Sequence, residues 1–238
     1  HLRERILHIA LDHAFERTRP IGRIPALLGQ PVARAYVEIE HNLALFQQSV
    51  DTRTSFLHVR DASPRVTFGN RWVRESVLEL YREDIARFRT LIGTELDENP
   101  LERLRKGEIP ELKVLRLHNG TVYRWNRACY GITDGKPHLR IECRVIPSGP
   151  TVLDEVANAA LWYGIIIWLS HQYEDITKLI EFEHAKMNFL NAARQGLPAQ
   201  MVWLNGEEMP AAKLILEKLL PMAEEGLRHR GVDDADVR

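Results

Sequence analysis

Apolar residues recur every three or four positions in several stretches of the chain, which predicts that most of it is helical. The clearest amphipathic pattern spans residues 72–92, where apolar side chains fall on one side and Glu and Arg on the others. Further helices are expected at residues 2–15, 32–50, 151–173, 177–193 and 211–228. The polar tail, residues 231–238, is expected to fray.

Strand-like segments separate these helical patterns. Residues 113–118, 121–126 and 138–146 favour strands, and the first two meet at Asn119-Gly120, a strong hairpin signal. Residues 64–69 are expected to form a short extended segment that ends at Gly69. The sequence therefore predicts an α+β fold in which a small, mainly antiparallel sheet packs against several helices.

Composition places the chain among ordinary globular proteins, because 45% of its 238 residues are hydrophobic and 27% are charged. The formal net charge is only -1, so no overall field attracts nucleic acid or an acidic membrane. The longest apolar run, residues 157–169, is shorter than the roughly 20 residues that cross a bilayer and is expected to be a buried helix. Two cysteines without a CxxC pair suggest neither a disulfide framework nor a zinc site, which favours the cytoplasm.

The strand predicted at residues 138–146 concentrates charge. Strand alternation places His138, Arg140, Glu142 and Arg144 on one face and apolar residues on the other. Two interpretations are open. In one, the charges pair with one another on a solvated surface. In the other, a carboxylate that can bind Mg²⁺ stands beside guanidinium groups that can clamp phosphate, as phosphoryl transfer requires.

The segment before this strand adds further polar groups. Tyr123 and Arg127 are expected to share one strand face, with Arg124 and Asn126 on the opposite face. If this segment pairs with residues 138–146, Arg127 joins the cationic cluster. After the strand, Thr151 or Ser148 is expected to cap the next helix.

Two runs of sequence carry a family resemblance. Residues 117–127 read LHNGTVYRWNR and residues 138–151 read HLRIECRVIPSGPT. Together they resemble the carboxy-terminal active-site strands of the glutamate-cysteine ligase type 2 (carboxylate-amine ligase) family. Residues 45–53 and 64–69 are similar to a branch of that family, so the resemblance spans roughly residues 45–231. Residues 1–44 form a helical segment without a clear match, and residues 232–238 form the tail.

The resemblance implies part of a glutamine-synthetase-like fold, whose antiparallel sheet forms a funnel for ATP, Mg²⁺ and an acid substrate. It implies that ATP phosphorylates a carboxylate and that an amine then displaces phosphate to form an amide bond, with glutamate and cysteine as the family's default substrates in glutathione biosynthesis. On this mapping Glu142 is the metal ligand, and Arg144 and Arg127 are catalytic. Substrate or nucleotide binding falls to Arg140, Arg127, Tyr123 and Asn126.

The sequence departs from the family pattern before Leu45. The family's earlier strands carry Glu-x-Glu carboxylates, whereas the Glu-x-Glu pair that precedes Leu45, Glu38 and Glu40, lies in a helical run. Because the chain begins at His1, its start is interpreted as a truncation point. The alternative hypothesis is a non-catalytic ligase half that acts as a binding or assembly module, forming homo-oligomers or other complexes through unpaired strand edges.

Overall fold

The structure is a computed structural model that describes residues 65–90, 98–146 and 151–237. These residues form two compact units, one made by residues 65–146 and the other by residues 151–237. Both units combine helices with two-stranded sheets, which confirms the predicted α+β class. The helices predicted at residues 2–15 and 32–50, and the pair Glu38 and Glu40, lie outside the described residues.

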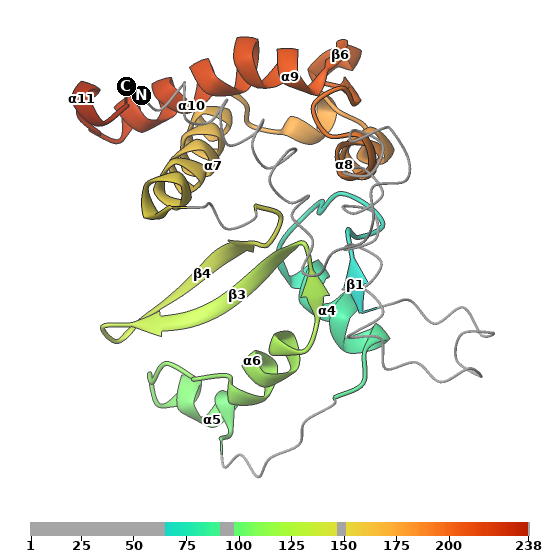
Figure 1. Cartoon of the computed structure of the whole chain (residues 1–238). Helices are drawn as coiled ribbons and strands as arrows, with labels where there is room; N and C mark the ends of the chain where they lie inside the picture. The colour runs from blue at the N-terminus through green and yellow to red at the C-terminus, as the bar shows by residue number, and fades with distance from the viewer. Residues whose placement is uncertain (1–64, 91–97, 147–150, 238) are drawn as a thin grey trace, which may run out of the picture. The chain divides into compact units, whose positions relative to one another are not determined.

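The first unit is built around a long hairpin (Figure 1). Its elements are β1 (Val66–Thr67), α4 (Leu78–Arg87), α5 (Pro100–Arg105), α6 (Lys113–Gly120), β2 (Tyr123–Arg124), β3 (Asn126–Thr133) and β4 (Lys136–Cys143). Strand β1, the extended segment predicted from residues 64–69, pairs in parallel with β2, whereas β3 and β4 pair antiparallel. In the part of the chain that the structure describes, the strands thus form separate two-stranded sheets and not one continuous sheet.

The turn of this hairpin is Asp134-Gly135. Both residues have positive φ, 50° and 70°, as a two-residue type I′ turn requires. Such a turn matches the right-handed twist of the flanking strands and fixes their register. That register places Arg127 directly opposite Glu142.

The hairpin predicted at Asn119-Gly120 is wrong, because residues 113–120 form helix α6. His118 and Asn119 are buried at the end of this helix, where their side chains bind backbone carbonyl groups: His118 Nε2 lies 2.9 Å from the oxygen of Phe88, and Asn119 Nδ2 donates to that of Ala128 at 2.8 Å. Both side chains are thus buried and hydrogen-bonded with the segment in helical conformation, which outweighs the turn signal of the pair.

The amphipathic helix predicted at residues 72–92 is shorter than expected, since α4 begins at Leu78. Its buried side also differs from the apolar pattern. Tyr81 and Asp84 are buried on α4 and Phe88 is buried just after it, whereas Ile85 is 58% exposed. The helix turns Asp84 inward because the buried guanidinium of Arg124 binds that carboxylate.

The second unit is mainly helical (Figure 1). It contains α7 (Val152–Gln172), the 3-10 turn η1 (Ile176–Lys178), α8 (Phe182–Gln195), β5 (Gln200–Val202), the turn η2 (Leu204–Gly206), β6 (Glu208–Pro210), α9 (Ala211–Leu214), the π-helical segment η3 (Ile215–Leu219), α10 (Leu220–His229) and α11 (Asp234–Val237). Strands β5 and β6 pair antiparallel. The helices predicted at residues 151–173 and 211–228 are confirmed.

Two predictions for this unit are corrected at helix ends. The helix expected at residues 177–193 is divided, because η1 ends at Lys178 and α8 begins at Phe182. The tail does not fray through residue 237, because α11 buries Val237.

The predicted cap of α7 is Thr151, whose hydroxyl accepts from the Asp154 amide at 3.3 Å while the Asp154 carboxylate accepts from the Thr151 amide at 3.0 Å. These two bonds form a reciprocal capping box.

Helices α7 and α10 approach each other closely through glycines. A Cβ atom added at Gly226 would lie 2.0 Å from the carbonyl oxygen of Gly164, and one at Gly164 would lie 2.3 Å from that of Ala223. Beside this contact, Ala157 and Leu220 form a small buried core. Because glycine leaves the two backbones in contact, a larger side chain at either position must separate the helices.

Helix α7 is less buried than predicted. Only 22% of its most apolar 18-residue window is buried, and Val156, Tyr163 and Ile166 are exposed. Its most apolar 18-residue window has a mean hydropathy of 1.4, so among the described helices this 21-residue helix is the one that meets the length and composition of a membrane span. A single helix of this kind is weak evidence for a membrane protein.

Candidate functional site

The β3–β4 hairpin brings Arg127, Glu142 and Arg144 together. Arg127 donates from Nε to Glu142 Oε2 at 2.8 Å, its Nη2 lies 2.6 Å from the same oxygen, and its Nη1 donates to the Asn119 carbonyl at 2.9 Å. Arg144 Nε lies 3.2 Å from that carboxylate oxygen. The strand pairing that the sequence analysis made a condition for Arg127 joining the cluster is therefore present.

The charge of Glu142 is stabilised by these neighbours. Partial burial alone disfavours the ionised carboxylate, but the guanidinium groups of Arg127 and Arg144 outweigh it and lower the pKa of Glu142. At neutral pH the carboxylate is therefore ionised and acts as the shared counter-ion of two arginines.

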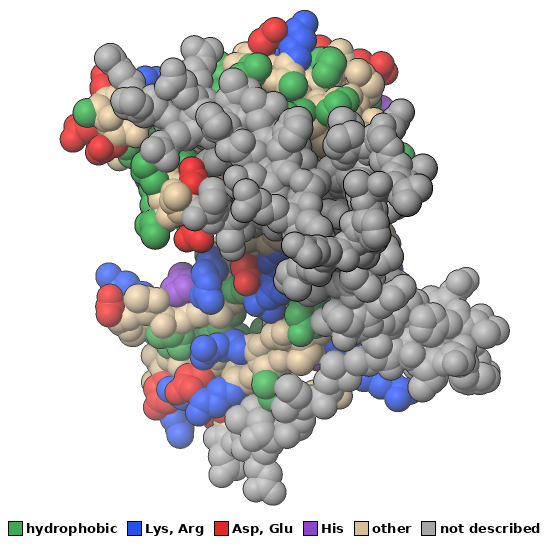
Figure 2. All heavy atoms as spheres, viewed as in Figure 1, with side chains coloured by type: hydrophobic (Ala, Val, Ile, Leu, Met, Phe, Trp, Pro, Cys, Tyr) green, Lys and Arg blue, Asp and Glu red, His purple; other side chains and the backbone are tan. Residues whose placement is uncertain are grey.

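Arg140 differs from these two arginines. It lies opposite Cys129 on the hairpin, its side chain is exposed, and it makes no ion pair or side-chain hydrogen bond with other described residues. Of the pairs expected among Arg140, Glu142 and Arg144, the one between Glu142 and Arg144 is therefore present, and Arg140 takes no part. Figure 2 shows Lys and Arg side chains gathered over the hairpin with a His and an acidic side chain beside them.

The other predicted binding residues are placed differently. The ring of Tyr123 lies under the guanidinium of Arg144, with 5.4 Å between the ring centroid and Cζ, so Tyr123 supports the cluster. Asn126 is exposed and pairs with Cys143, one position along the strand from Arg127, so its side chain points to the opposite face of the hairpin. The structure therefore does not bring Asn126 to the Glu142 cluster.

Two groups near the hairpin were missed by sequence reasoning. Arg124 is buried against α4, where Asp84 Oδ1 accepts from its Nε at 2.9 Å and its Nη2 at 2.6 Å, and Glu83 Oε2 accepts from Nη2 at 3.1 Å. Tyr81 is 7% exposed, and its hydroxyl has no hydrogen-bond partner among the described residues. Asp84, a carboxylate on the apolar side of the predicted helix, was the available signal for the buried Arg124 pair. No signal in the sequence indicated the unpaired hydroxyl of Tyr81.

The described residues do not provide a magnesium site by themselves. No group of three or more His, Cys, Asp or Glu side chains in residues 65–90, 98–146 and 151–237 is arranged to hold a metal ion. Glu142 contributes one carboxylate, and its Oε2 is already engaged by two arginines. Mg²⁺ prefers several oxygen ligands in near-octahedral geometry, so this donor set does not fit it. The guanidinium groups fit a carboxylate or a phosphate.

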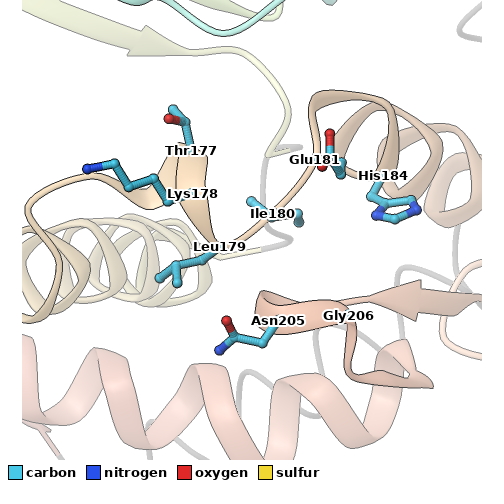
Figure 3. A pocket seen from close by; sticks show the side chains of 8 residues that line it. All are labelled: Thr177, Lys178, Leu179, Ile180, Glu181, His184, Asn205 and Gly206. Carbon is cyan, nitrogen blue, oxygen red and sulfur yellow. The ribbon is translucent and has the colours of Figure 1, made fainter.

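A surface pocket of about 230 Å³ occurs in the second unit, away from all six predicted site residues in sequence. Figure 3 shows it between η1, the first turn of α8 and the Asn205-Gly206 turn. Two of its polar side chains are already engaged, because Thr177 Oγ1 donates to Asp175 at 2.6 Å and Lys178 Nζ lies 3.6 Å from the same carboxylate. The other polar side chains that line the pocket are those of Glu181, His184 and Asn205.

Comparison of the chain with protein-family models, curated proteins and solved structures found no match.

Proposed function

We propose that the chain provides the anion-binding part of an ATP-dependent carboxylate-amine ligase of the glutamate-cysteine ligase type. The observation that carries this proposal is the set of three guanidinium groups, those of Arg127, Arg140 and Arg144, on the hairpin whose sequence resembles the active-site strands of that family. Charged groups of this kind recognise phosphate and carboxylate through paired N–H donors.

The proposed reaction creates the need for such groups. A carboxylate of the acid attacks the γ-phosphorus of ATP, the bond to the β-phosphate breaks, and an acyl phosphate and ADP form. The amine then attacks the acyl carbon, inorganic phosphate leaves, and an amide remains. Negative charge lies on the phosphoryl oxygens in both steps, and positioned guanidinium groups stabilise it.

The environment of the cluster favours this role. Arg127 and Arg144 are mostly shielded from water, and Glu142 holds both of them in one place. Charges that are already oriented need no reorganisation as the transferring group gains charge, so they stabilise it more strongly than mobile surface arginines. The described residues do not fit Mg²⁺ by themselves, so the proposed cofactor set of ATP and Mg²⁺ is tested directly.

The test is an assay of the purified 238-residue chain with ATP, Mg²⁺, L-glutamate and L-cysteine. We expect ADP to form only when the acid is present, and we expect Arg144→Gln to reduce its rate at least about 100-fold, as loss of one charge-stabilising donor typically does. Glu183→Gln on α8 is the control, because Glu183 is exposed and its nearest partner is Lys186 at 3.5 Å. ADP formation that is independent of any acid, or unchanged in Arg144→Gln, would overturn the proposal.

A second candidate, an assembly module without catalysis, is favoured by a different observation. Leu139 and Ile141 lie on the apolar face of β4, and they are 57% and 68% exposed. Within the described residues, β3 and β4 also have no further strand neighbour. Exposed apolar strands with open edges favour pairing with another chain.

The second candidate is tested by light scattering during size-exclusion chromatography. An assembly that dissociates in the Leu139→Lys/Ile141→Lys double variant, in a chain that binds no nucleotide, would support it over the ligase. A monomer at every concentration tested would rule out homo-oligomerisation through this face.

A further inference from the structure

We propose that Asn205 is a site of spontaneous deamidation, at which the pair Asn205-Gly206 converts slowly to aspartate and isoaspartate. The sequence contains two Asn-Gly pairs, Asn119-Gly120 and Asn205-Gly206. The structure places them in opposite environments, so that the second pair is open to reaction and the first is protected. This inference concerns the second unit and does not depend on the proposed ligase activity.

The reaction needs no enzyme and no co-reactant except water. The backbone nitrogen of Gly206 attacks Cγ of Asn205 and loses its proton, and the side-chain nitrogen leaves as ammonia, so that a five-membered succinimide remains. Water then opens this ring at one of its two carbonyl carbons and gives either aspartate or isoaspartate, each with one more negative charge than asparagine. Glycine at the next position favours the attack, because a residue without Cβ leaves its nitrogen least obstructed.

Asn205 lies in the exposed turn between β5 and β6. Its side chain makes no hydrogen bond with other described residues, and its backbone is left-handed, with φ 57° and ψ 23°. A Cβ atom added to Gly206 would meet no atom within 4 Å, so the space beside the attacking nitrogen is open. Attack requires rotation about ψ of Asn205, which breaks the 3.1 Å hydrogen bond from the Gly206 amide to the Trp203 carbonyl. The barrier imposed by the fold is therefore one hydrogen bond in an exposed turn.

Asn119 has the same neighbour in sequence but is held rigidly. It is 7% exposed, and its Nδ2 donates to the Ala128 carbonyl at 2.8 Å. Both residues of this pair belong to helix α6, in which backbone N–H groups point along the helix axis while side chains project away from it. The Gly120 nitrogen therefore cannot approach Cγ of Asn119 unless the end of the helix unfolds and the buried amide group leaves its partner.

Deamidation at this position alters the surroundings of the turn. The backbone N–H of Asn205 donates to the Leu179 carbonyl at 2.7 Å, and this bond joins the turn to the segment that follows η1. Isoaspartate lengthens the backbone by one methylene group directly after that N–H, so the bond should weaken. The new carboxylate also adds negative charge to the wall of the surface pocket, which Asn205 lines together with Glu181 (Figure 3). We therefore expect the modified turn to release residues 176–180.

The experiment follows both Asn-Gly pairs in one sample. The full chain is incubated for several weeks at body temperature and mildly alkaline pH, and its peptides are analysed by mass spectrometry with electron-transfer dissociation, which distinguishes isoaspartate from aspartate. In the folded chain we expect the peptide that contains Asn205 to convert at least tenfold faster than the peptide that contains Asn119. In denaturing urea the two rates should agree within about twofold, because the difference comes from the fold and not from the shared Asn-Gly sequence.

Asn205→Gln is the matched control, because it keeps an uncharged amide side chain whose longer reach disfavours the five-membered ring. This variant should release at least tenfold less ammonia from the turn peptide, and circular dichroism establishes that it is folded. Hydrogen exchange of residues 176–180 should accelerate in the aged chain and stay constant in aged Asn205→Gln. Equal conversion of Asn119 and Asn205 in the folded chain, or an unmodified Asn205 in a sample whose urea-denatured chain converts, would overturn the proposal.

Discussion

Replacing Asp84 by alanine should destabilise the first unit strongly, because it leaves the guanidinium of Arg124 buried without its main partner. The two side chains are 5% and 6% exposed, and Asp84 Oδ1 accepts two hydrogen bonds from Arg124. Burial raises the pKa of Asp84, against the effect of Arg124, so desolvation is the larger influence on this carboxylate. Breaking such a buried pair typically costs about 3–5 kcal/mol. We expect about 3 kcal/mol, the low end, because Glu83 remains 3.1 Å from Arg124.

Hydrogen exchange measured by mass spectrometry suits this prediction, since a chain with two compact units need not unfold in one transition. Peptides from α4 and β2 should lose about 3 kcal/mol of opening free energy in Asp84→Ala, while peptides from α7 keep theirs. Arg71→Ala is the matched control, because Arg71 is exposed and lies 3.5 Å from Glu79, and surface pairs contribute about 0–1 kcal/mol. Equal losses in the two variants would refute the reasoning.

Three further predictions concern the helix contact, the helix cap and the hairpin. Gly226→Ala should destabilise the second unit by about 1–3 kcal/mol in urea unfolding, because its Cβ would meet the Gly164 carbonyl; Gly120→Ala, with open space around its Cβ, should not. Thr151→Ala should cost about 1 kcal/mol in the same assay by removing the cap of α7. Since the folded-state pKa of Glu142 is lowered, its stabilising contribution is present above the ordinary value of 4.5 and is lost as pH falls below it. Exchange of hairpin amides should therefore accelerate in that acidic range, and Glu142→Gln should abolish this dependence; an unchanged profile would contradict it.

Sequence pattern predicted helices well where apolar spacing and a terminal signal agreed. Residues 151–173 combine an apolar run with a Thr151 cap, and the structure confirms that helix. The prediction from apolar spacing failed where polar side chains form the buried side of a helix. In α6 the buried residues are His118 and Asn119, and on α4 Asp84 is buried while Ile85 is exposed. Apolar periodicity cannot identify a buried carboxylate whose partner lies 40 residues away in sequence.

The candidate site shows the same division. Alternation along β4 predicted that Glu142 and Arg144 lie together, and strand pairing added Arg127. Alternation also placed Arg140 on this face, but it could not predict that Glu142 pairs with Arg127 and Arg144 and not with Arg140. The register follows from the turn at Asp134-Gly135. The sequence analysis placed the hairpin turn at Asn119-Gly120 instead.

The most direct test of the account is titration of the chain with a non-hydrolysable ATP analogue in the presence of Mg²⁺, beside Arg144→Gln and the Glu183→Gln control. If the hairpin cluster binds the phosphates, the unmodified chain and the control should bind with the same affinity. Arg144→Gln should bind at least about tenfold more weakly, equivalent to about 1.4 kcal/mol. Equal affinity in Arg144→Gln, or no binding by a folded chain, would contradict the proposal that this hairpin is a nucleotide-binding surface.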